Sequence, residues 1–534
     1  MLIFLIIFIF WLVSAIIDYS EFCYYWQLKE YRLDRFKDFL STLSGKKFLF
    51  SYSVCWRPII LFIFCFLFTI DSRLFSLEPN LLLLILTIDL ARGILLFKYK
   101  RFKYPKITFK SVVIISISFF IELFLFAFLS WAGLSLLAIA CRWLIISSIV
   151  MIAKLPTKLI KIIYLKIARK KLLRQKNLLV IGVTGSYGKT TVKNFLEQIL
   201  SKKFKVIKTP KNINTEIGIA KFIINNKLSD FDIFIVEMGA YRIGEIKIIC
   251  DMVQPQIGIL TAINEQHLQL FGSIKNTQIA KYELLRSLPK SGLAIVNFDN
   301  AYCSEFLTEL KCNIKTFGQT KNYNLDCLIT DIKNSSVGFE FIAIIKNKNG
   351  IENYQIKTNL VGAHNVMNIA PVLLTANYLG LTKQEIIEQS AKLKLPEATL
   401  EVVNYGKSII INDSYNSNPQ GFLAALKVLD EYQGDWKKIV ITRGMLELGK
   451  RSQYWHEKIG QAIAQVANEL IIISPDSVEP FKKGIGNNKN ISVKVELNPK
   501  KLLANFQQFR NKKCLILIEN QLSQNVYQEL IGYT

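Results

Sequence analysis

No two cysteines in this sequence are spaced as a CxxC pair, although the chain contains nine cysteines. Structural zinc sites and redox-active dithiols usually carry such pairs, so we expect neither in this chain. We interpret the nine cysteines as free thiols in a reducing compartment.

Acidic residues are few: 41 Asp and Glu stand against 67 Lys and Arg, which gives a formal net charge of +26. Residues 154–176 contain nine basic side chains and no acid. Such an excess can indicate binding to nucleic acid, but beside apolar runs it more often marks the cytoplasmic face of a membrane. Because 51% of the residues are hydrophobic and the mean hydropathy is +0.28, we favour membrane lipids as partners and expect no nucleic acid.

The first apolar run, residues 2–17, lacks the preceding basic residues and the following small-residue cleavage site of a signal peptide. We therefore expect a membrane span that is retained. Four further apolar runs cover residues 58–70, 81–97, 111–131 and 134–153. Five spans place the basic segments 29–47, 98–110 and 154–176 on one side of the membrane. The N-terminus is then predicted outside, and the large C-terminal part in the cytoplasm.

Four charged residues fall inside the predicted spans: Asp89, Arg92, Glu122 and Arg142. Asp89 and Arg92 are three residues apart and share a helical face. A charge at membrane depth indicates a functional site by default. The alternative is that these residues form buried ion pairs that fix the helices to one another, and both interpretations stay open at this point.

A glycine-containing turn follows an apolar strand in residues 180–191, Val-Ile-Gly-Val-Thr-Gly-Ser-Tyr-Gly-Lys-Thr-Thr. Val183 occupies the position of the first glycine of the long P-loop motif, so the motif is the shorter Thr-Gly-x-x-Gly-Lys-Thr form. Glycines let backbone N–H groups close on phosphate oxygens, while the following helix and the lysine add positive charge. We therefore predict a triphosphate site with a hydroxyl ligand for Mg²⁺, formed by Gly185, Ser186, Tyr187, Gly188, Lys189, Thr190 and Thr191.

From Asn177 onward, short apolar runs alternate with helical patterns, which predicts a mostly parallel α/β sheet. Ligands gather at the carboxyl ends of parallel strands. Glu237 closes one such run and His267 follows another, so both are candidate ligands of Mg·ATP. Alternating runs between residues 310 and 360 predict added antiparallel strands, and the pattern beyond Pro396 predicts a second, Rossmann-like α/β domain.

Further motifs accompany the phosphate loop in a fixed order. They are Asn-Ile-Asn-Thr-Glu-Ile-Gly (212–218), Glu-Met-Gly-Ala-x-x-x-Gly-Glu-Ile (237–246), His-Leu-x-x-Phe-Gly-Ser (267–273), Ile-Ala-Lys-Tyr-Glu (279–283), Asn-Phe-Asp-Asn (297–300), Gly-Ala-His-Asn-Val-x-Asn (362–368), Asn-Asp-Ser-Tyr-Asn-Ser-Asn-Pro (412–419) and Met-Leu-Glu-Leu-Gly (445–449). With these motifs the chain from about 177 to 470 resembles the Mur ligase family, nearest the type that adds D-alanyl-D-alanine to the peptidoglycan stem peptide.

The predicted fold is thus an α-helical membrane domain followed by α/β, namely a P-loop Mur ligase central domain and a Rossmann-like C-terminal domain. We predict a membrane domain of about five transmembrane helices at 1–153 and a basic juxtamembrane linker at 154–176. A central ATP-binding domain at 177–394 and a C-terminal domain at 395–534 follow.

The resemblance implies catalytic and metal-binding roles. Lys189 and the loop amides would hold the β- and γ-phosphates of ATP. Thr190 and Glu237 would hold one Mg²⁺. His267 would hold a second, helped by Lys281, which resembles the family lysine that can be carbamylated into a metal-binding anion.

The resemblance also implies residues that contact the substrates. Asn365 and Asn368 would lie near the adenine, and Asp413 would reach the ribose side from the C-terminal domain. The residues implied to face the acceptor are Asn212, Asn214 and Thr215.

The implied chemistry is amide formation driven by ATP. A carboxylate must attack the γ-phosphorus although both carry negative charge, and two Mg²⁺ ions and a lysine would offset that repulsion. The product would be an acyl phosphate, which an amine converts to an amide while closure of the C-terminal domain excludes water. The implied partners are a peptidoglycan-precursor-like carboxylate acceptor and an amine such as D-alanyl-D-alanine. With the spans, this predicts a multi-pass protein of the bacterial inner membrane with cytoplasmic catalytic domains.

Three features depart from the family pattern. Thr399, in Pro-Glu-Ala-Thr-Leu-Glu (396–401), replaces an arginine that faces the phosphates, and Lys394 or Arg443 could supply that charge. Glu-Asn-Gln (519–521) stands where the usual chain has a Lys-Gly-Ser-type strand turn. Predicted spans replace the N-terminal uridine-nucleotide-binding domain, so we expect an acceptor that is membrane-linked or presented by another protein.

Three other functions are alternatives to this ligase activity. A degenerate relative could serve as a membrane scaffold or nucleotide sensor, which Thr399 favours slightly. A transport ATPase is disfavoured because no second acidic motif of that class is evident. An amino-acid ligase acting on another acceptor, such as a polyglutamate-type ligase, would carry the same motifs.

Overall fold

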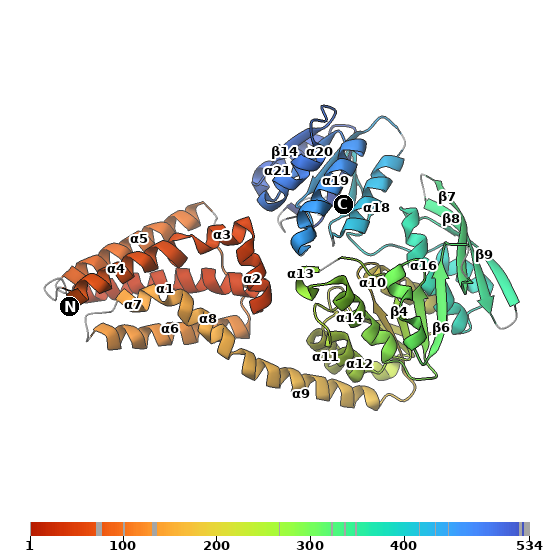
Figure 1. Cartoon of the computed structure of the whole chain (residues 1–534), viewed down its shortest axis with the longest axis horizontal. Helices are drawn as coiled ribbons and strands as arrows, with labels where there is room; N and C mark the ends of the chain where they lie inside the picture. Colours follow the sequence, from red (N-terminus) through yellow and green to blue (C-terminus); the bar gives the residue numbers. More distant parts are fainter. Residues whose placement is uncertain are drawn as a thin grey trace. The chain divides into compact units, whose positions relative to one another are not determined.

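The computed structural model describes residues 2–70, 77–99, 102–130, 136–265, 268–321, 324–335, 338–347, 350–415, 417–432, 434–446, 448–522 and 526–527. The chain divides into two compact units, Met1–Ile160 and Lys161–Thr534. The first unit is helical, and the second is built on two β-sheets (Figure 1).

Apolar helices form the N-terminal unit. They are α1 (Leu2–Leu28), α2 (Leu33–Ser41), α3 (Leu43–Leu49), η1 (Tyr52–Trp56), α4 (Arg57–Ile70), α5 (Glu78–Lys98), α6 (Phe109–Ser130), α7 (Leu136–Ala140), α8 (Arg142–Ile152) and the start of α9 (Lys154–Leu173). By length and composition, four helical stretches could cross a membrane, or five if the pair Leu43–Leu49 and Tyr52–Leu67, bent by 43°, forms one span. Each of the five expected apolar runs overlaps one or two of these helices, while their membrane location stays a prediction.

Three of the four charged residues expected in the spans, Asp89, Glu122 and Arg142, are buried inside this unit. Arg57 lies 2.6 Å from Asp18 and 2.8 Å from Asp89. Arg142 lies 2.9 Å from both Asp18 and Glu122. All five side chains are at most 2% exposed. A charge network that joins α1, α4, α5, α6 and α8 therefore fixes these helices to one another, as the ion-pair interpretation requires.

Arg92 does not pair with Asp89, its neighbour on the helical face. It contacts Asp18 at 3.0 Å and also Glu21, both on α1. The reason is that α5 packs against α1, so the acids of the neighbouring helix lie closer than an acid on the same helix. A spacing of three residues on a helix makes an ion pair between Asp89 and Arg92 possible, but it does not require one.

A nine-stranded sheet with the order β2-β3-β1-β4-β5-β6-β7-β8-β9 forms the first part of the second unit. Its strands are β1 (Leu179–Thr184), β2 (Val206–Lys208), β3 (Ile233–Glu237), β4 (Ile257–Leu260), β5 (Leu293–Asn297), β6 (Asn313–Gly318), β7 (Cys327–Ser335), β8 (Gly338–Asn347) and β9 (Gly350–Thr358). The first six are parallel, and β7, β8 and β9 add antiparallel pairings. Because β1 lies between β3 and β4, the loops that follow these three strands meet at one edge of the sheet.

Helices cover both faces of this sheet (Figure 1). On one face lie α10 (Lys189–Leu200), α16 (Val366–Tyr378) and α17 (Lys383–Ser390). On the other lie α11 (Glu216–Asn225), α12 (Glu245–Val253) and α14 (Ile274–Arg286). Ala168 and Leu172 of α9 join the second core, so the end of the segment expected to be a linker packs against the sheet domain.

The second sheet has the order β10-β11-β15-β12-β13-β14. Its strands are β10 (Glu401–Tyr405), β11 (Ser408–Asp413), β12 (Lys437–Thr442), β13 (Glu469–Ile472), β14 (Ser492–Val495) and β15 (Cys514–Glu519), and its helices are α18 (Pro419–Glu431), α19 (Ser452–Val466), α20 (Val478–Ile485) and α21 (Pro499–Phe509). Among the described strands of this second sheet, β10 alone pairs with its neighbour in the antiparallel direction. The predicted second α/β sheet is therefore present.

Candidate functional site

The predicted phosphate loop lies between β1 and α10, at the edge where the loops after β1, β3 and β4 meet. Gly185 and Gly188 have positive φ angles of 154° and 79°. A Cβ atom would lie 1.9 Å from Thr261 Oγ1 at the first glycine and 2.5 Å from Asn368 Oδ1 at the second. Both positions thus require glycine, since the backbone passes directly against neighbouring side chains. This close, backbone-lined turn fits a triphosphate.

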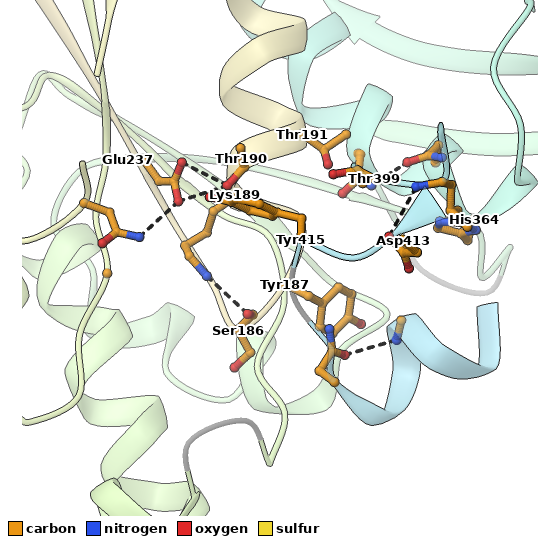
Figure 2. Close-up of a pocket in the computed structure, with 18 of the residues that line it drawn as sticks. Ser186, Tyr187, Lys189, Thr190, Thr191, Glu237, His364, Thr399, Asp413 and Tyr415 are labelled. Carbon is orange, nitrogen blue, oxygen red and sulfur yellow. Dashed lines mark hydrogen bonds between the residues drawn. The ribbon is translucent and has the colours of Figure 1, made fainter. Parts of the chain in front are cut away.

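Lys189 begins α10 and folds back over the loop (Figure 2). Its Nζ donates to the carbonyl oxygens of Gly185 at 2.8 Å and Ser186 at 3.1 Å. Burial lowers the pKa of Lys189, and the nearby Glu237 carboxylate partly offsets that effect. The two carbonyl oxygens are neutral acceptors. A phosphate bound in the loop would be a charged acceptor and would bind this ammonium group more strongly.

Glu237 is the centre of the hydrogen-bond network beside the loop. It ends β3 next to Val183 of β1, and it is 1% exposed. Thr190 Oγ1 donates to it at 3.0 Å (Figure 2). Asn214 Nδ2 donates to it at 3.3 Å, and Lys193 Nζ lies 2.9 Å from it. A hydroxyl and a carboxylate at the phosphate end of the loop are the oxygen ligands that Mg²⁺ prefers. The residues present therefore fit a Mg²⁺-bound nucleotide.

Lys281 of α14 lines the same pocket and is 3% exposed. Burial, and after it the positive charge of Lys189, hold the pKa of Lys281 well below its usual range. Both effects shift Lys281 toward the neutral amine, which is the form that carbamylation requires. His267, the expected ligand of a second metal, lies outside the described residues.

The two residues implied to lie near the adenine face the pocket from one helical segment. Asn365 ends η5 (Ala363–Asn365), and Asn368 lies in the first turn of α16. Asn368 donates to Asn365 Oδ1 at 2.9 Å, and Asn365 donates to the carbonyl of Val361 at 3.1 Å. These amides are thus held in place on the loop side of the pocket, beside Gly188.

The C-terminal sheet supplies the other wall of the pocket. Asp413, Tyr415 and Asn418 line it, and the N–H of Leu400 donates to Asp413 Oδ1 at 3.2 Å. Figure 2 shows Tyr415 beside Lys189 of the phosphate loop and Asp413 beside His364 and Thr399. The site therefore exists only where the two α/β domains meet.

Direct hydrogen bonds join the two domains around the pocket. Asn264, after β4, donates to Asn418 at 3.3 Å. Glu265 accepts from Arg451, directly before α19, at 3.1 Å and from Trp455, in the first turn of α19, at 2.5 Å. These bonds join the two walls of the pocket.

The three residues implied to face the acceptor differ in their position relative to the pocket. Asn214 lines the pocket and reaches Glu237. Asn212, with a positive φ of 66°, accepts from the Tyr415 hydroxyl at 2.9 Å. Thr215 precedes α11 without a capping hydrogen bond from its side chain, and it is absent from the described lining of the pocket.

Thr399 lines the pocket at the position of the family arginine. Neither proposed substitute is among the described residues that line it. Lys394 is exposed, and Arg443 interacts with Asp476. In the described part of the pocket wall, the lysines are Lys189 and Lys281.

Sequence reasoning assigned no role to Lys193, two residues after the phosphate-loop motif, or to Tyr415, which lies inside a quoted motif. A lysine four residues after another on a helix is usually exposed, whereas Lys193 is 1% exposed and paired with Glu237. Only the pairing of β1 with β3 reveals this contact. Tyr415 reaches the site across the domain boundary, for which the linear sequence holds no signal.

Two protein-family models match this chain. One, described as the Mur ligase middle domain, matches residues 183–376. The other, described as the Mur ligase, glutamate ligase domain, matches residues 400–518. Together they cover both walls of the pocket.

Curated relatives are named UDP-N-acetylmuramoyl-tripeptide–D-alanyl-D-alanine ligase. That of Bacillus subtilis is 31% identical over 316 residues, which cover 58% of this chain and 63% of the relative. That of Buchnera aphidicola (strain Bp) is 31% identical over 363 residues, which cover 66% and 76%. The chain spans 63% and 59% of the length of the B. subtilis and Synechocystis relatives.

Solved structures extend the likeness to the fold. MurF ligase from Thermotoga maritima in complex with ADP has a TM-score of 0.60 at 26% identity, covering 70% of this chain and 82% of that chain. MurF from Acinetobacter baumannii has a TM-score of 0.61 at 23% identity, with 70% and 80% covered, and supports the fold alone.

Proposed function

Because this chain belongs to the Mur ligase family, we propose that it is an ATP-dependent amide ligase of the MurF type. The reaction would join an amine such as D-alanyl-D-alanine to the carboxylate of a peptidoglycan-type peptide. One observation carries the proposal: the phosphate loop, Glu237 and Lys281 converge in a single pocket that the C-terminal sheet closes. A nucleotide-binding domain without ligase chemistry would not need that second wall.

Each residue of the pocket has a defined task in this reaction. The loop amides and Lys189 would bind the phosphates, and Thr190 and Glu237 would hold Mg²⁺. Lys193 pairs with Glu237 inside the protein, so it compensates the charge of the carboxylate and holds the side chain in place. When bound, Mg·ATP would supply the phosphoryl group that activates the acceptor carboxylate. Asn214 is well placed to orient that acceptor, because it bridges the pocket and Glu237.

We further propose that the N-terminal unit is a membrane domain. Its candidate spans support this, and so do large apolar side chains that stand exposed on α4 and α6. Phe66 is 65% exposed, Phe120 65% and Phe124 69%. Exposed apolar surface of this kind indicates contact with lipid. The protein would then reside in the bacterial inner membrane with its catalytic domains in the cytoplasm.

Helix α9 supports contact with an anionic membrane surface. It carries basic residues along its length, and Leu155, Leu159 and Ile163 are more than half exposed. Basic helices with an exposed apolar stripe bind anionic bilayers. An acceptor that is lipid-linked, or presented by another membrane protein, would suit this location.

The test is phosphate release from ATP by the detergent-solubilised chain, with acceptors and amines added one at a time. We expect release to require both a peptide carboxylate and an amine, and lipid-linked peptide to be preferred over soluble UDP-linked peptide. Lys189→Ala should abolish it. If the protein turns over the soluble UDP-linked peptide and ignores the lipid-linked peptide, the proposed lipid-linked acceptor is wrong. If Lys189→Ala still releases phosphate in response to an acceptor, the assigned phosphate site is wrong.

A second function, as a degenerate scaffold or nucleotide sensor, is favoured by one observation. Thr399 leaves the described pocket wall without the family arginine. This alternative predicts that the chain binds nucleotide but releases no phosphate with any acceptor. The same assay therefore separates the two functions.

A further inference from the structure

Helix α9 is attached to both ends of α11. The ammonium group of Lys161 pairs with Glu216 in the first turn of α11. At the far end of α11, Lys171 Nζ donates to the carbonyl oxygens of Ile224 at 2.7 Å and Asn226 at 2.8 Å. The two lysines therefore hold α9 along the length of α11.

The face of α9 that carries these two lysines also packs in the core of the central domain. Ala168 and Leu172 are buried in that core, and Tyr164 and Leu165 pack against it. Lys221 of α11 lies 5.6 Å from the centre of the Tyr164 ring. Together with the two lysines, the α9 side chains recur every three or four positions, which defines one face of a helix. This face joins α9 and α11 into one packed structure.

The start of α11 is connected in turn to the pocket through residues 212–215, which we call the acceptor loop. Asn214 of this loop lines the pocket and lies two residues before Glu216. Its backbone carbonyl accepts from the N–H of Gly239 at 2.8 Å, and Ile213 packs against the same core as α9. Packed side chains and backbone hydrogen bonds thus connect α9 to the acceptor side of the pocket.

The opposite face of α9 is exposed and combines isoleucine with basic side chains. No acidic residue occurs between residues 154 and 176, so this outer face is complementary to an anionic bilayer surface. The helix also belongs to the stretch Arg142–Leu173, which is long and apolar enough to cross a membrane. The exposed residues of the outer face are Ile162, Ile163, Lys166, Ile167, Arg169, Lys170, Leu173 and Arg174.

We propose that α9 binds the anionic headgroups of a bilayer through this outer face and thereby holds the acceptor loop close to the membrane surface. A helix is about 10 Å across, so the start of α11 lies within about 20 Å of a bilayer that contacts α9. A short peptide on a lipid headgroup can bridge that distance, because each extended residue adds about 3.5 Å. The acceptor class is then a lipid-linked peptide. This inference rests on the proposed function and gives the contact between α9 and lipid a role in acceptor binding.

The test is hydrogen exchange of the full chain in nanodiscs of phosphatidylcholine, with and without phosphatidylglycerol. Headgroups that bind α9 stabilise its packing on α11, so amides of both helices should exchange more slowly. We expect exchange in residues 212–226 to be on the order of fivefold slower with the anionic lipid, the effect of about one basic side chain near an anionic surface. Equal exchange rates in the two kinds of nanodisc overturn the inference.

Two variants locate the connection between α9 and the acceptor loop. Glu216→Gln removes the pair with Lys161 but leaves the charge of α9 unchanged. Exchange in α9 and at the end of α11 that Lys171 holds should still respond to the anionic lipid, whereas the acceptor loop should lose its response. Glu197→Gln is the matched control, because Glu197 forms a partly exposed pair with Lys208, away from α9. A response of the acceptor loop that survives in Glu216→Gln, or is lost in both variants, overturns the inference.

Steady-state kinetics in the same nanodiscs separate this inference from the proposed function. The anionic lipid should lower KM for a lipid-linked peptide and leave KM for ATP unchanged, because α11 leads to the acceptor loop and not to the phosphate loop. An equal fall of both constants contradicts the inference. If the chain turns over no acceptor, the proposed ligase function is wrong, while hydrogen exchange still decides whether lipid acts on the acceptor loop. If the chain does not enter nanodiscs, the proposed membrane domain is wrong and the inference falls with it.

Discussion

At the scale of single residues, the site depends on one buried charge pair. Lys193 and Glu237 are each about 1% exposed and lie 2.9 Å apart. Removal of one member leaves a buried charge without compensation, which typically costs about 3–5 kcal/mol. We expect Lys193→Met to lower the free energy of unfolding by that amount, as measured by urea denaturation.

A neighbouring lysine provides the control for this prediction. Lys208 pairs with Glu197 at 2.6 Å, but both side chains are partly exposed. Exposed pairs contribute about 0–1 kcal/mol, so Lys208→Met should have little effect. Equal losses in the two variants would contradict the role given to Lys193.

The turn glycine Gly188 permits a second prediction. It precedes α10 with a φ of 79°, and an added Cβ would lie 2.5 Å from Asn368 Oδ1. Gly188→Ala should therefore displace the phosphate loop, and a misplacement of about 1 Å can reduce turnover about 100-fold. The measurement is the rate of acceptor-dependent phosphate release.

Gly244 is the matched position, because it precedes α12 with a φ of 94° and has no atom within 4 Å of an added Cβ. Gly244→Ala should carry only the backbone strain, about 1–2 kcal/mol of stability, and leave turnover unchanged. If both variants lose activity alike, contact with Asn368 is not what Gly188 avoids.

Residues of the phosphate loop were predictable because their chemistry is local: glycine, lysine and threonine act within one turn. Glu237 was predictable because it ends an apolar run. Lys193 and Tyr415 were not, since their roles arise from strand pairing and from contact between domains.

At the scale of secondary structure, the link between the central sheet and α19 makes a third prediction. Glu265, after β4, binds Arg451 and Trp455. Glu265→Ala should favour the open arrangement of the domains and lower kcat/KM about fivefold, which corresponds to about 1 kcal/mol. Steady-state kinetics and the temperature of unfolding check this.

The control for this variant lies within one domain. Glu309 pairs with Arg286 of α14 at 2.6 Å, also with partly exposed side chains. Glu309→Ala should change neither kcat/KM nor the temperature of unfolding by a measurable amount. Loss of activity in both variants would show that Glu265 does not act through the domain contact.

Most strands coincide with buried apolar runs, which is why the two sheets could be expected from the sequence. No individual strand was predicted at β6, β9, β10 or β14, and the clearest cases are β10 and β14. Both lie at edges of the second sheet and alternate between exposed and partly buried positions, so they present no apolar run. Hydrogen bonds to the neighbouring strand, rather than their own composition, stabilise these segments in the extended conformation.

At the scale of the whole molecule, the boundary between the units can be tested by truncation. Ala168 and Leu172 of α9 pack in the core of the central domain, although the predicted boundary lies at residue 177. A fragment of residues 161–534 should fold and bind MgADP. A fragment of residues 177–534 should be less stable by about 2 kcal/mol, the value of one buried leucine.

Denaturation of the two fragments under the same conditions makes this comparison. Equal stability would mean that α9 adds nothing to the central domain and acts only as a connection. The charge network around Arg57 and Arg142 lies wholly in the first unit, so neither fragment leaves it incomplete.

The central claim is that the pocket activates a carboxylate by transfer of a phosphoryl group. Transfer of ¹⁸O tests it most directly: the acceptor peptide carries ¹⁸O in its reacting carboxylate, and mass spectrometry follows the released phosphate. If the carboxylate oxygen attacks phosphorus and the amine then displaces phosphate, each phosphate released carries one ¹⁸O from the labelled group. Phosphate free of ¹⁸O, released while ATP is consumed, would contradict the account.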